Sequence, residues 1–468
     1  AYRPYTYDEW RQAVPSPSGY EATRIVFGEE MGVGPLRSPA DFFVLENGDL
    51  AILDSGNNRI ILADAGYRVR KVLADISQDG APSPLNNPQG LFVDRDGTIL
   101  VADTSNSRVV VLDPEGRILQ EFRKPASELY PQKEEFRPQK VLRDPSGITY
   151  VICTGIYSGA VMYSPQGEFL GFFGSNRVEV TFRLLADRFW KSIFSDENRN
   201  KLANYIPVEY SSFDLDAEGF IYSVTASSND PVNRVRKLNS LGLNILETHA
   251  GNSFQGGFGD MNPYVYNRML VSTRLSDIDA SRDGFLFCLD STRGRVFQYD
   301  AEANLMFVFG GIGNQLGLFM NPTAVESVGD RVLVLDRNTG AMTEFRRTEF
   351  GQAVREAITL YNDGYHRESV EPWRQVLAMD SNYNIAYVGL GKAAFEAGRY
   401  GEALRNFRIA AYVSGYSQAF KERRKEVFRE TFTWLVLGLA GVVLLLLGLG
   451  VLRRRLAVSG LGARMEAH

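Results

Sequence analysis

The chain changes its hydrophobic period once, near residue 350. Up to that point apolar and polar residues alternate as in half-buried β-strands, whereas residues 351–418 follow the 3.6-residue period of helices. The clearest β unit, residues 87–113, has three short strands and a left-handed turn at Asp96-Gly97. It occurs six times: an apolar strand, a glycine turn, a second strand ending in a polar turn, and a third strand. The other five turns centre on Gly48, Gly147, Gly219, Gly284 and Gly329.

The two ends of this repeat region complement each other. The sixth unit, residues 321–346, lacks a fourth strand, whereas residues 22–28 look like a fourth strand without its first three. We therefore expect residues 22–27 to pair with residues 341–345, because a closed ring leaves no exposed strand edge. The prediction is a mainly β protein with a six-bladed β-propeller at 21–348, after an N-terminal extension of residues 1–20.

A polar turn of the form D-x-x-N/R-x-R follows the second strand in three units, at residues 54–59, 103–108 and 290–295. These units resemble NHL repeats, a family of four-stranded propeller blades. The Asp and Arg side chains could bind a ligand, but an Asp at a strand end more often caps the next turn. We therefore assign them a structural role.

The third unit carries an insertion at about 178–206. Phe182 and Phe189 recur there at helical spacing, with Trp190 beside them, and a polar stretch follows. This pattern predicts an amphipathic hairpin whose apolar face packs on the propeller rim. The alternative is a docking surface for a partner, with Phe182, Phe189 and Trp190 as its contacts.

Residues 349–418 contain two helical units offset by 34 residues, with Ala357 matching Gly391 and Trp373 matching Phe407. The second unit, Y-V-G-L-G-K-A-A-F-E-A-G-R-Y-G-E-A-L-R-N-F, resembles a tetratricopeptide repeat. Small residues at matched positions let paired helices approach closely, and the large aromatic fills the remaining space. The two repeats serve either as a packing base or as a peptide-binding surface.

No charged residue occurs in residues 431–452, which are long enough as a helix to cross a bilayer. We predict one transmembrane helix there, joined without a break to a juxtamembrane helix at 419–430. Gly438, Gly441 and Gly448 share one face of the span. They either dock against a partner helix or are simply tolerated by the bilayer.

The orientation of the span does not follow from its flanking charges. Five basic residues precede it and three follow it, which favours a cytoplasmic N-terminal domain. However, the chain begins at Ala1, as after removal of a signal peptide, and long domains cross the membrane regardless of charge. We expect the propeller outside the cell and residues 453–468 as a short cytoplasmic tail; a tail-anchored cytoplasmic protein is the alternative.

The amino-acid composition excludes several classes of function. The 51 basic and 56 acidic residues balance closely, which argues against nucleic-acid binding. Two cysteines, Cys153 and Cys288, lie in different blades and should be buried thiols, and three scattered histidines offer little for zinc or catalysis. No set of carboxylates converging on the axis is evident in the sequence. We expect no catalytic residue, cofactor or metal, and no enzymatic activity.

Four segments carry a wider resemblance: Y-R-P-Y-T-Y-D-E-W near the start, V-R-K-L-N-S-L-G at 235–242, F-Q-Y-D at 297–300 and L-Y-N-D-G-Y at 360–365. The chain resembles bacterial exported proteins with NHL repeats, tetratricopeptide repeats and a single span. Genes of that family tend to lie beside those of ABC-type carbohydrate permeases, solute-binding proteins and Yip-type membrane proteins.

The resemblance implies a non-enzymatic binding or scaffold subunit on the outer side of the cell membrane, accessory to an ABC-type carbohydrate transporter. Its partners would be permease-like subunits, and further a solute-binding protein or a glycan. Two alternatives stay open. One is a lactonase-type propeller hydrolase with a divalent cation on its axis. The other is a free-standing cell-surface glycan sensor.

Overall fold

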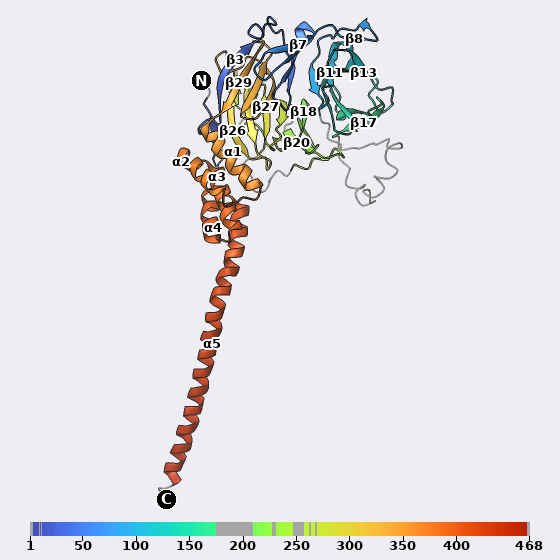
Figure 1. Cartoon of the computed structure of the whole chain (residues 1–468). Helices are drawn as coiled ribbons and strands as arrows, with labels where there is room; N and C mark the ends of the chain where they lie inside the picture. The colour runs from blue at the N-terminus through green and yellow to red at the C-terminus, as the bar shows by residue number, and fades with distance from the viewer. Residues whose placement is uncertain are drawn as a thin grey trace.

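The computed structural model describes residues 3–465 except 9, 11, 175–208, 227–230, 247–256, 262–263 and 267–268. A β-propeller forms one end of the molecule, four short helices lie beneath one side of it, and a long final helix leads away (Figure 1). The N-terminus lies at the side of the propeller and the C-terminus at the far end of that helix.

Blades one to three are four-stranded antiparallel sheets in simple sequence order. Their second strands are buried along their whole length, as expected for strands packed between neighbouring blades. Their bounds are β4 Asp41–Val44, β5 Leu50–Asp54, β6 Arg59–Ala63 and β7 Val69–Leu73; β10 Gly90–Val93, β11 Ile99–Asp103, β12 Arg108–Leu112 and β13 Ile118–Phe122; and β14 Pro138–Arg143, β15 Thr149–Cys153, β16 Ala160–Tyr163 and β17 Phe169–Phe173.

Blades four to six complete the ring. Blade four has three strands among the described residues, and blades five and six have four. Their bounds are β18 Ser212–Leu215, β19 Ile221–Val224 and β20 Val235–Leu238; β23 Leu275–Ala280, β24 Leu286–Asp290, β25 Arg295–Tyr299 and β26 Leu305–Gly310; and β27 Pro322–Val328, β28 Arg331–Asp336, β29 Ala341–Arg347 and β3 Tyr20–Phe27.

The N-terminal strand β3 closes the sixth blade, so the predicted pairing of the two ends of the ring is confirmed. Ala341 pairs with Phe27 and Phe345 with Ala22. The six-bladed propeller predicted from the repeats is therefore present. The glycine turns also form as predicted; Gly97, for example, has φ +85°, a conformation that side chains with a Cβ rarely adopt.

The polar turns after the second strands of blades one and two have a structural role, as predicted. Asp54 Oδ1 accepts a hydrogen bond from the backbone N–H of Arg37 at 2.7 Å, and its Oδ2 accepts from Arg59 Nε at 2.7 Å. Asp103 and Arg108 repeat the second of these contacts in blade two. The carboxylates of Asp54 and Asp103 are completely buried, so these pairs fix the turns rather than offering a ligand surface.

Several short elements decorate the ring. The two-stranded pairs are β1 Tyr5–Tyr7 with β2 Ala13–Pro15, β8 Ser77–Gln78 with β9 Ala81–Pro82, and β21 Tyr264–Tyr266 with β22 Met269–Val271. Among the described residues, 3-10 turns occupy η1 Ser55–Asn57, η2 Thr104–Asn106 and η5 Pro231–Arg234. Cys153 and Cys288 are buried free thiols, as the sequence predicted.

Four helices follow the propeller and form two antiparallel pairs: α1 Glu349–Asn362, α2 Val370–Met379, α3 Asn384–Glu396 and α4 Tyr400–Ile409. Thr348 caps α1 by accepting a hydrogen bond from the N–H of Gly351. A Cβ on Gly391 would lie 2.4 Å from the Phe407 ring, which confirms that a small residue there lets the second pair approach closely.

The helices pack against the underside of blade five. The Phe350 and Tyr383 rings lie 5.2 Å apart and share one apolar core with Phe307, while the Tyr383 hydroxyl donates to the carbonyl of Met306 at 3.0 Å. Lys392 on α3 contacts Glu302 at 2.7 Å. The faces of α1 and α3 are thus covered by the propeller, which fixes the helical base to the ring.

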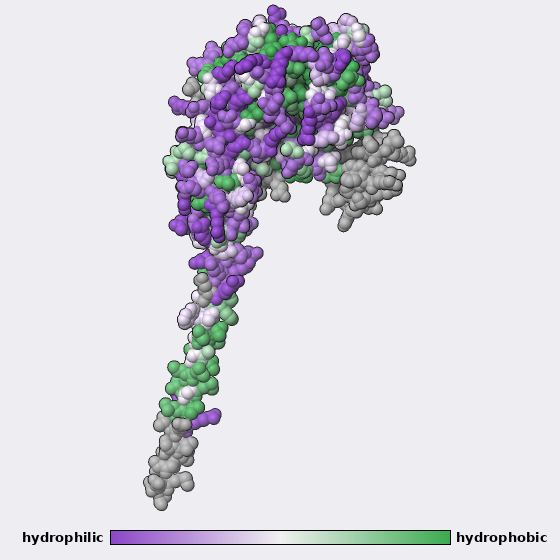
Figure 2. Space-filling model, viewed as in Figure 1, coloured by the Kyte–Doolittle hydropathy of each residue, from purple (hydrophilic) through white to green (hydrophobic). Residues whose placement is uncertain are grey.

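The last helix, α5 Val413–Met465, is unbroken for 53 residues. It packs on α4 as far as Ala419, which is completely buried, and then leaves the rest of the described chain. An 18-residue stretch within it reaches a mean hydropathy of 2.8 with none of it buried, so the helix is long and apolar enough to span a membrane. Figure 2 shows this apolar part of α5 beyond a polar head.

Candidate functional site on the propeller axis

The first strand of each blade lines the axis. These six strands contact one another in a closed cycle, from β4 through β10, β14, β18, β23 and β27 back to β4. Their pairing registers define two layers of side chains on the same strand face, two residues apart. The upper layer comprises Asp41, Gly90, Lys140, Ser212, Asp277 and Ala324, and the lower layer comprises Phe43, Phe92, Leu142, Asp214, Asp279 and Glu326.

A buried cation crosses the axis in the upper layer. Lys140 from blade three places its Nζ 2.7 Å from Asp41 Oδ1 in blade one and 3.0 Å from Asp277 Oδ1 in blade five. Ser212 from blade four donates to the same Asp277 oxygen at 2.6 Å. The Lys140 side chain is only 15% exposed, so one ammonium group joins three alternate blades at the centre of the ring.

The axial carboxylates also join neighbouring blades through the backbone. Asp41 accepts from the N–H of Leu91 in the next blade at 2.9 Å, and Asp277 accepts from that of Val325 at 2.8 Å. Asp214 accepts from the N–H of Ala280 at 2.7 Å. Hydrogen bonds of this kind satisfy one oxygen of each carboxylate and help to hold adjacent first strands together.

The lower layer divides into an acidic half and an apolar half. Asp214, Asp279 and Glu326 come from the consecutive blades four, five and six. Opposite them are Phe43 and Phe92, whose rings meet edge to face with centroids 5.2 Å apart, and the buried Leu142. Among the described residues, no ion pair joins a Lys or Arg to any of the three acids.

Burial and mutual repulsion raise the pKa values of these axial acids. Burial, together with the Asp277 charge, raises the pKa of Asp214 to about 7, although its backbone hydrogen bond opposes the shift. Burial, followed by the Asp214 charge, raises the pKa of Asp279, and burial and the Asp279 charge raise that of Glu326. Burial also raises the pKa of Asp41 to about 6 despite the neighbouring Lys140.

The lower layer lies toward the helical side of the ring. β23 runs from Leu275 to Ala280 and then turns, so Asp279 is next to the turn that contains Asp283. Asp283 forms an ion pair with Arg355 on α1, which places this turn at the face where the helices pack. The acidic half-ring is therefore nearer to the helical end of the axis than Lys140 is.

No convergent carboxylates are evident in the sequence, and the axial cluster corrects that expectation. The turn motif drew attention to acids at the ends of second strands, whereas these acids belong to first strands. A signal was present: S-F-D-L at 212–215 and D-I-D-A at 277–280 place polar residues at alternate positions in the innermost strands. Only the ring closure shows that these positions meet.

The residues predicted to contact partners fall into two groups. Phe182, Phe189 and Trp190 lie outside the described residues. Gly438, Gly441 and Gly448 lie on α5, and no other side chain or backbone lies within 4 Å of a Cβ built on any of them. That face is open for contact with another helix, but it is remote from the axial cluster.

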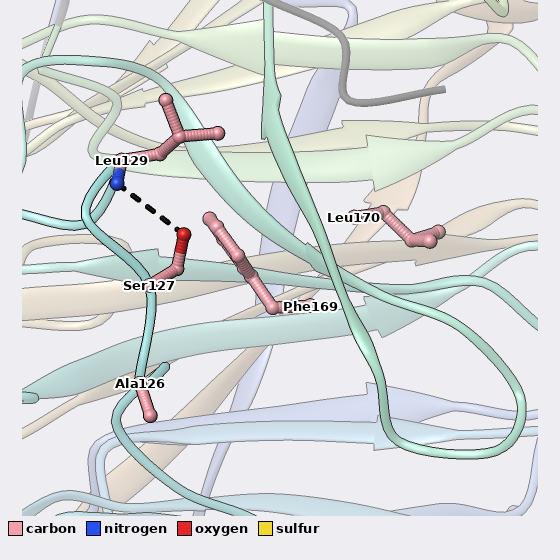
Figure 3. A pocket seen from close by; sticks show the side chains of 5 residues that line it. All are labelled: Ala126, Ser127, Leu129, Phe169 and Leu170. Carbon is pink, nitrogen blue, oxygen red and sulfur yellow. Dashed lines mark hydrogen bonds between the residues drawn. The ribbon is translucent and has the colours of Figure 1, made fainter. Parts of the chain in front are cut away.

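A shallow pocket lies on the rim of blade three, between β17 and the loop after β13 (Figure 3). It has a volume of about 350 Å³, and in Figure 3 Phe169 lies between the loop and Leu170. The N–H of Leu129 donates to Ser127 Oγ at 3.3 Å, which orders the loop. The lining has no ionisable side chain, so the axis is the stronger candidate for chemistry.

Among the described residues, no group of three or more His, Cys, Asp or Glu side chains has the geometry to hold a metal ion. Asp214 accepts a hydrogen bond from the N–H of Ala280, and Asp279 accepts one from the Ser327 hydroxyl.

Residues 85–112 match the family model of the NHL repeat, which corresponds to blade two. No curated protein matches the chain in sequence.

Solved propeller structures are similar over most of the ring. Virginiamycin B lyase from Staphylococcus aureus is 10% identical with a TM-score of 0.41, over 70% of this chain and 99% of its own. The PQQ-bound aldose sugar dehydrogenase from Streptomyces coelicolor is 15% identical with a TM-score of 0.42, over 71% and 99%. Regucalcin, a calcium-binding protein from Agrobacterium tumefaciens, is 13% identical with a TM-score of 0.38, over 66% and 89%.

These similarities are a likeness of fold, and they contradict one expectation. From the sequence we expect that the chain is not an enzyme. The similar structures include propeller enzymes, namely the lyase and the dehydrogenase, so this exclusion was wrong. The exclusion also rested on the lack of convergent carboxylates in the sequence. Carboxylates with raised pKa values do converge on the axis.

Proposed function

We propose that this protein is a membrane-anchored propeller that binds a positively charged ligand group on its axis, outside the cell, and works as a subunit of a membrane complex. The observation that carries the proposal is the lower axial layer. It holds three acids without a cationic partner among the described residues, facing two aromatic rings.

The ligand group that fits this layer is an organic ammonium or guanidinium ion. A cation between Asp214, Asp279 and Glu326 would relieve the repulsion that raises their pKa values. The Phe43 and Phe92 rings opposite would contact the apolar part of such a ligand and attract its charge. A neutral analogue gains the apolar contact but not the charge interaction.

The tether supports a role at a membrane surface. Lys392–Glu302 and the Phe350–Tyr383 contact hold the helical base on the propeller, and α5 continues from that base without a break. If the helical pairs are tetratricopeptide repeats, they act here as a packing base, since α1 and α3 face the ring. The axis would then keep a fixed tilt relative to the bilayer.

A permease-like partner is the finer part of the proposal. The family resemblance suggests an ABC-type carbohydrate transporter, and the open face at Gly438, Gly441 and Gly448 offers a place for a transmembrane helix to pack. In this arrangement the acidic half-ring, on the helical side of the propeller, would face the partner.

The ligand proposal is tested with benzylammonium and its neutral analogue benzyl alcohol. The full chain in lipid nanodiscs is titrated with each compound by calorimetry at pH 6 and pH 8. We expect benzylammonium to bind, more tightly at the higher pH because more axial carboxylates are ionised, and to release protons. Benzyl alcohol should bind at least about tenfold more weakly.

Matched variants locate the site. Asp214→Asn combined with Glu326→Gln should abolish the difference between the two compounds, whereas Asp64→Asn, in the turn between β6 and β7, should leave it unchanged. Equal binding of benzylammonium to the wild type and to the axial double variant would disprove an axial cation site.

A further inference from the structure

The N-terminal extension forms a clasp on blade five. We use the name clasp for residues 3–16, which include β1 and β2; among the described residues its strands pair only with each other. The clasp is held by its two tyrosines. The hydroxyls of Tyr5 and Tyr7 both donate to Asp260 Oδ1, the second at 3.0 Å, and the Tyr7 oxygen accepts from the N–H of Met261 at 3.1 Å.

Asp260 takes its other contacts from the polar turn of blade five. Its Oδ2 accepts from Arg295 Nη1 at 2.5 Å and also from Arg293. Arg295 further donates to the Tyr5 hydroxyl oxygen at 2.9 Å and lies over the Tyr5 ring. One carboxylate that is only 8% exposed thus joins two tyrosines of the clasp to two arginines of the blade.

In blades one and two, the arginine at the position of Arg295 contacts a different carboxylate. Asp54 pairs in register with Arg59, and Asp103 pairs with Arg108, and in both pairs the arginine Nε contacts its own Asp Oδ2 at 2.7 Å. Arg295 occupies this position in blade five, opposite Asp290. Its guanidinium is nevertheless directed to Asp260.

Because Arg295 contacts Asp260, Asp290 lacks the arginine contact that its counterparts in blades one and two have. Its Oδ1 accepts from the N–H groups of Arg274 and Thr292, but its Oδ2 is buried and has no hydrogen-bond partner. A buried carboxylate oxygen without a donor destabilises the state that contains it. Burial correspondingly raises the pKa of Asp290.

We propose that the clasp is a releasable strap whose opening is balanced by an arginine exchange: when Tyr5 and Tyr7 leave Asp260, Arg295 returns to Asp290. The closed state gains the Asp260 contacts and leaves Asp290 incomplete. The open state loses the tyrosines but restores the pair seen in blades one and two. The closed state completes the contacts of Asp260, and the open state completes those of Asp290. Opening therefore costs less free energy than the number of clasp contacts suggests.

Release would act on the helical base as well as on the blade. Ser16 Oγ donates to Asp380 Oδ2 at 2.9 Å, and Asp380 lies in the loop between α2 and α3. The closed clasp therefore ties blade five to the base that carries α5. An open clasp removes that tie while β3 stays in the ring, since Tyr20 is buried in the core.

Hydrogen exchange of the full chain in nanodiscs tests whether Arg295 moves between Asp260 and Asp290. The readout is the protection of the backbone amides of Tyr5–Tyr7 and of Ala13 and Val14. Asp260→Asn should speed their exchange about tenfold or more, because the closed contacts are weakened. Asp290→Asn should slow it by about threefold or more, because the open state can no longer gain an ion pair with Arg295.

The matched control is Asp103→Asn, which removes the equivalent carboxylate in blade two and should leave exchange in the clasp unchanged. Tyr5→Phe with Tyr7→Phe provides a milder opening variant if Asp260→Asn does not fold. If hydrogen exchange in the clasp is faster or unchanged in Asp290→Asn, the proposed movement of Arg295 between Asp260 and Asp290 is wrong. Unchanged exchange in the variants of Asp260 or of both tyrosines overturns the clasp itself.

Discussion

Lys140 in blade three and Asp277 in blade five are separated by a whole blade, yet their side chains meet at the propeller axis with Nζ and Oδ1 3.0 Å apart. Asp41 in blade one completes the contact. The charges of Asp277 and Asp41 raise the pKa of Lys140 against the opposing effect of its burial. The centre of the ring is therefore held by one cation on which two buried carboxylates depend.

We expect Lys140→Met to destabilise the propeller strongly. The substitution keeps the length of the side chain but leaves Asp41 and Asp277 buried without their cation, which costs about 3–5 kcal/mol for a buried pair. The free energy of unfolding is measured by denaturant titration of the purified chain. The matched control is Lys392→Met, because that contact with Glu302 is partly exposed and its loss costs about 1 kcal/mol or less. Equal effects of the two variants would contradict the central role of Lys140.

We expect stability of the propeller to fall as the pH rises between about 5 and 7. Asp214 and Asp41 have folded-state pKa values of about 7 and about 6, above their usual 3.8, so the folded chain binds more protons than the unfolded chain in this range. The free energy of unfolding then decreases with pH. Carboxyls with lowered pKa, such as Asp113, titrate below this window.

Thermal unfolding at several pH values across this range measures the effect. Asp214→Asn removes one titrating group and should flatten the curve. Asp64→Asn is the control, because backbone hydrogen bonds lower the pKa of Asp64 and it titrates below this window. A midpoint that rises from pH 5 to pH 7 in the wild type would be inconsistent with proton uptake at the axis.

The ring and its closure could be predicted from the sequence because strand period, glycine turns and the incomplete ends are local patterns. Asp96-Gly97 is a typical turn sequence, and residues 22–28 supply the fourth strand that the last unit lacks. The axial site could not be predicted in this way. Asp41, Lys140 and Asp277 are far apart in sequence, and each looks like a polar exception in an apolar strand until the register places them in one layer.

Closure by β3 gives a prediction with an internal control. Deleting residues 1–28 removes the strand that pairs with Ala341–Arg347 and exposes the edge of blade six, so the propeller should lose several kcal/mol or fail to unfold cooperatively. Deleting only residues 1–16 removes the clasp and keeps the ring closed, so it should have a much smaller effect. Circular dichroism during thermal unfolding compares the two. Similar melting of the 1–28 deletion and the intact chain would refute closure as a source of stability.

The glycine face of the span can be tested by co-purification. Gly441→Leu with Gly448→Leu fills the open face and should release a permease-like partner, while the chain stays folded and membrane-bound. Gly450→Leu is the matched control, since nine residues at about 100° each place it on the opposite side of the helix from Gly441. Quantitative mass spectrometry of material extracted in mild detergent measures the partners. If both variants retain the same partners, the glycine face is not the contact.

The closure of the ring by its first strand also sets the order in which the protein can be made. β3 is synthesised early, but its neighbour β29 follows about 310 residues later, which at ~5–20 residues per second is roughly 15–60 s of translation. Throughout that interval the nascent chain carries a strand with no partner. Residues 20–27 therefore stay an unpaired strand until blade six exists, and an unpaired strand is prone to aggregate during folding.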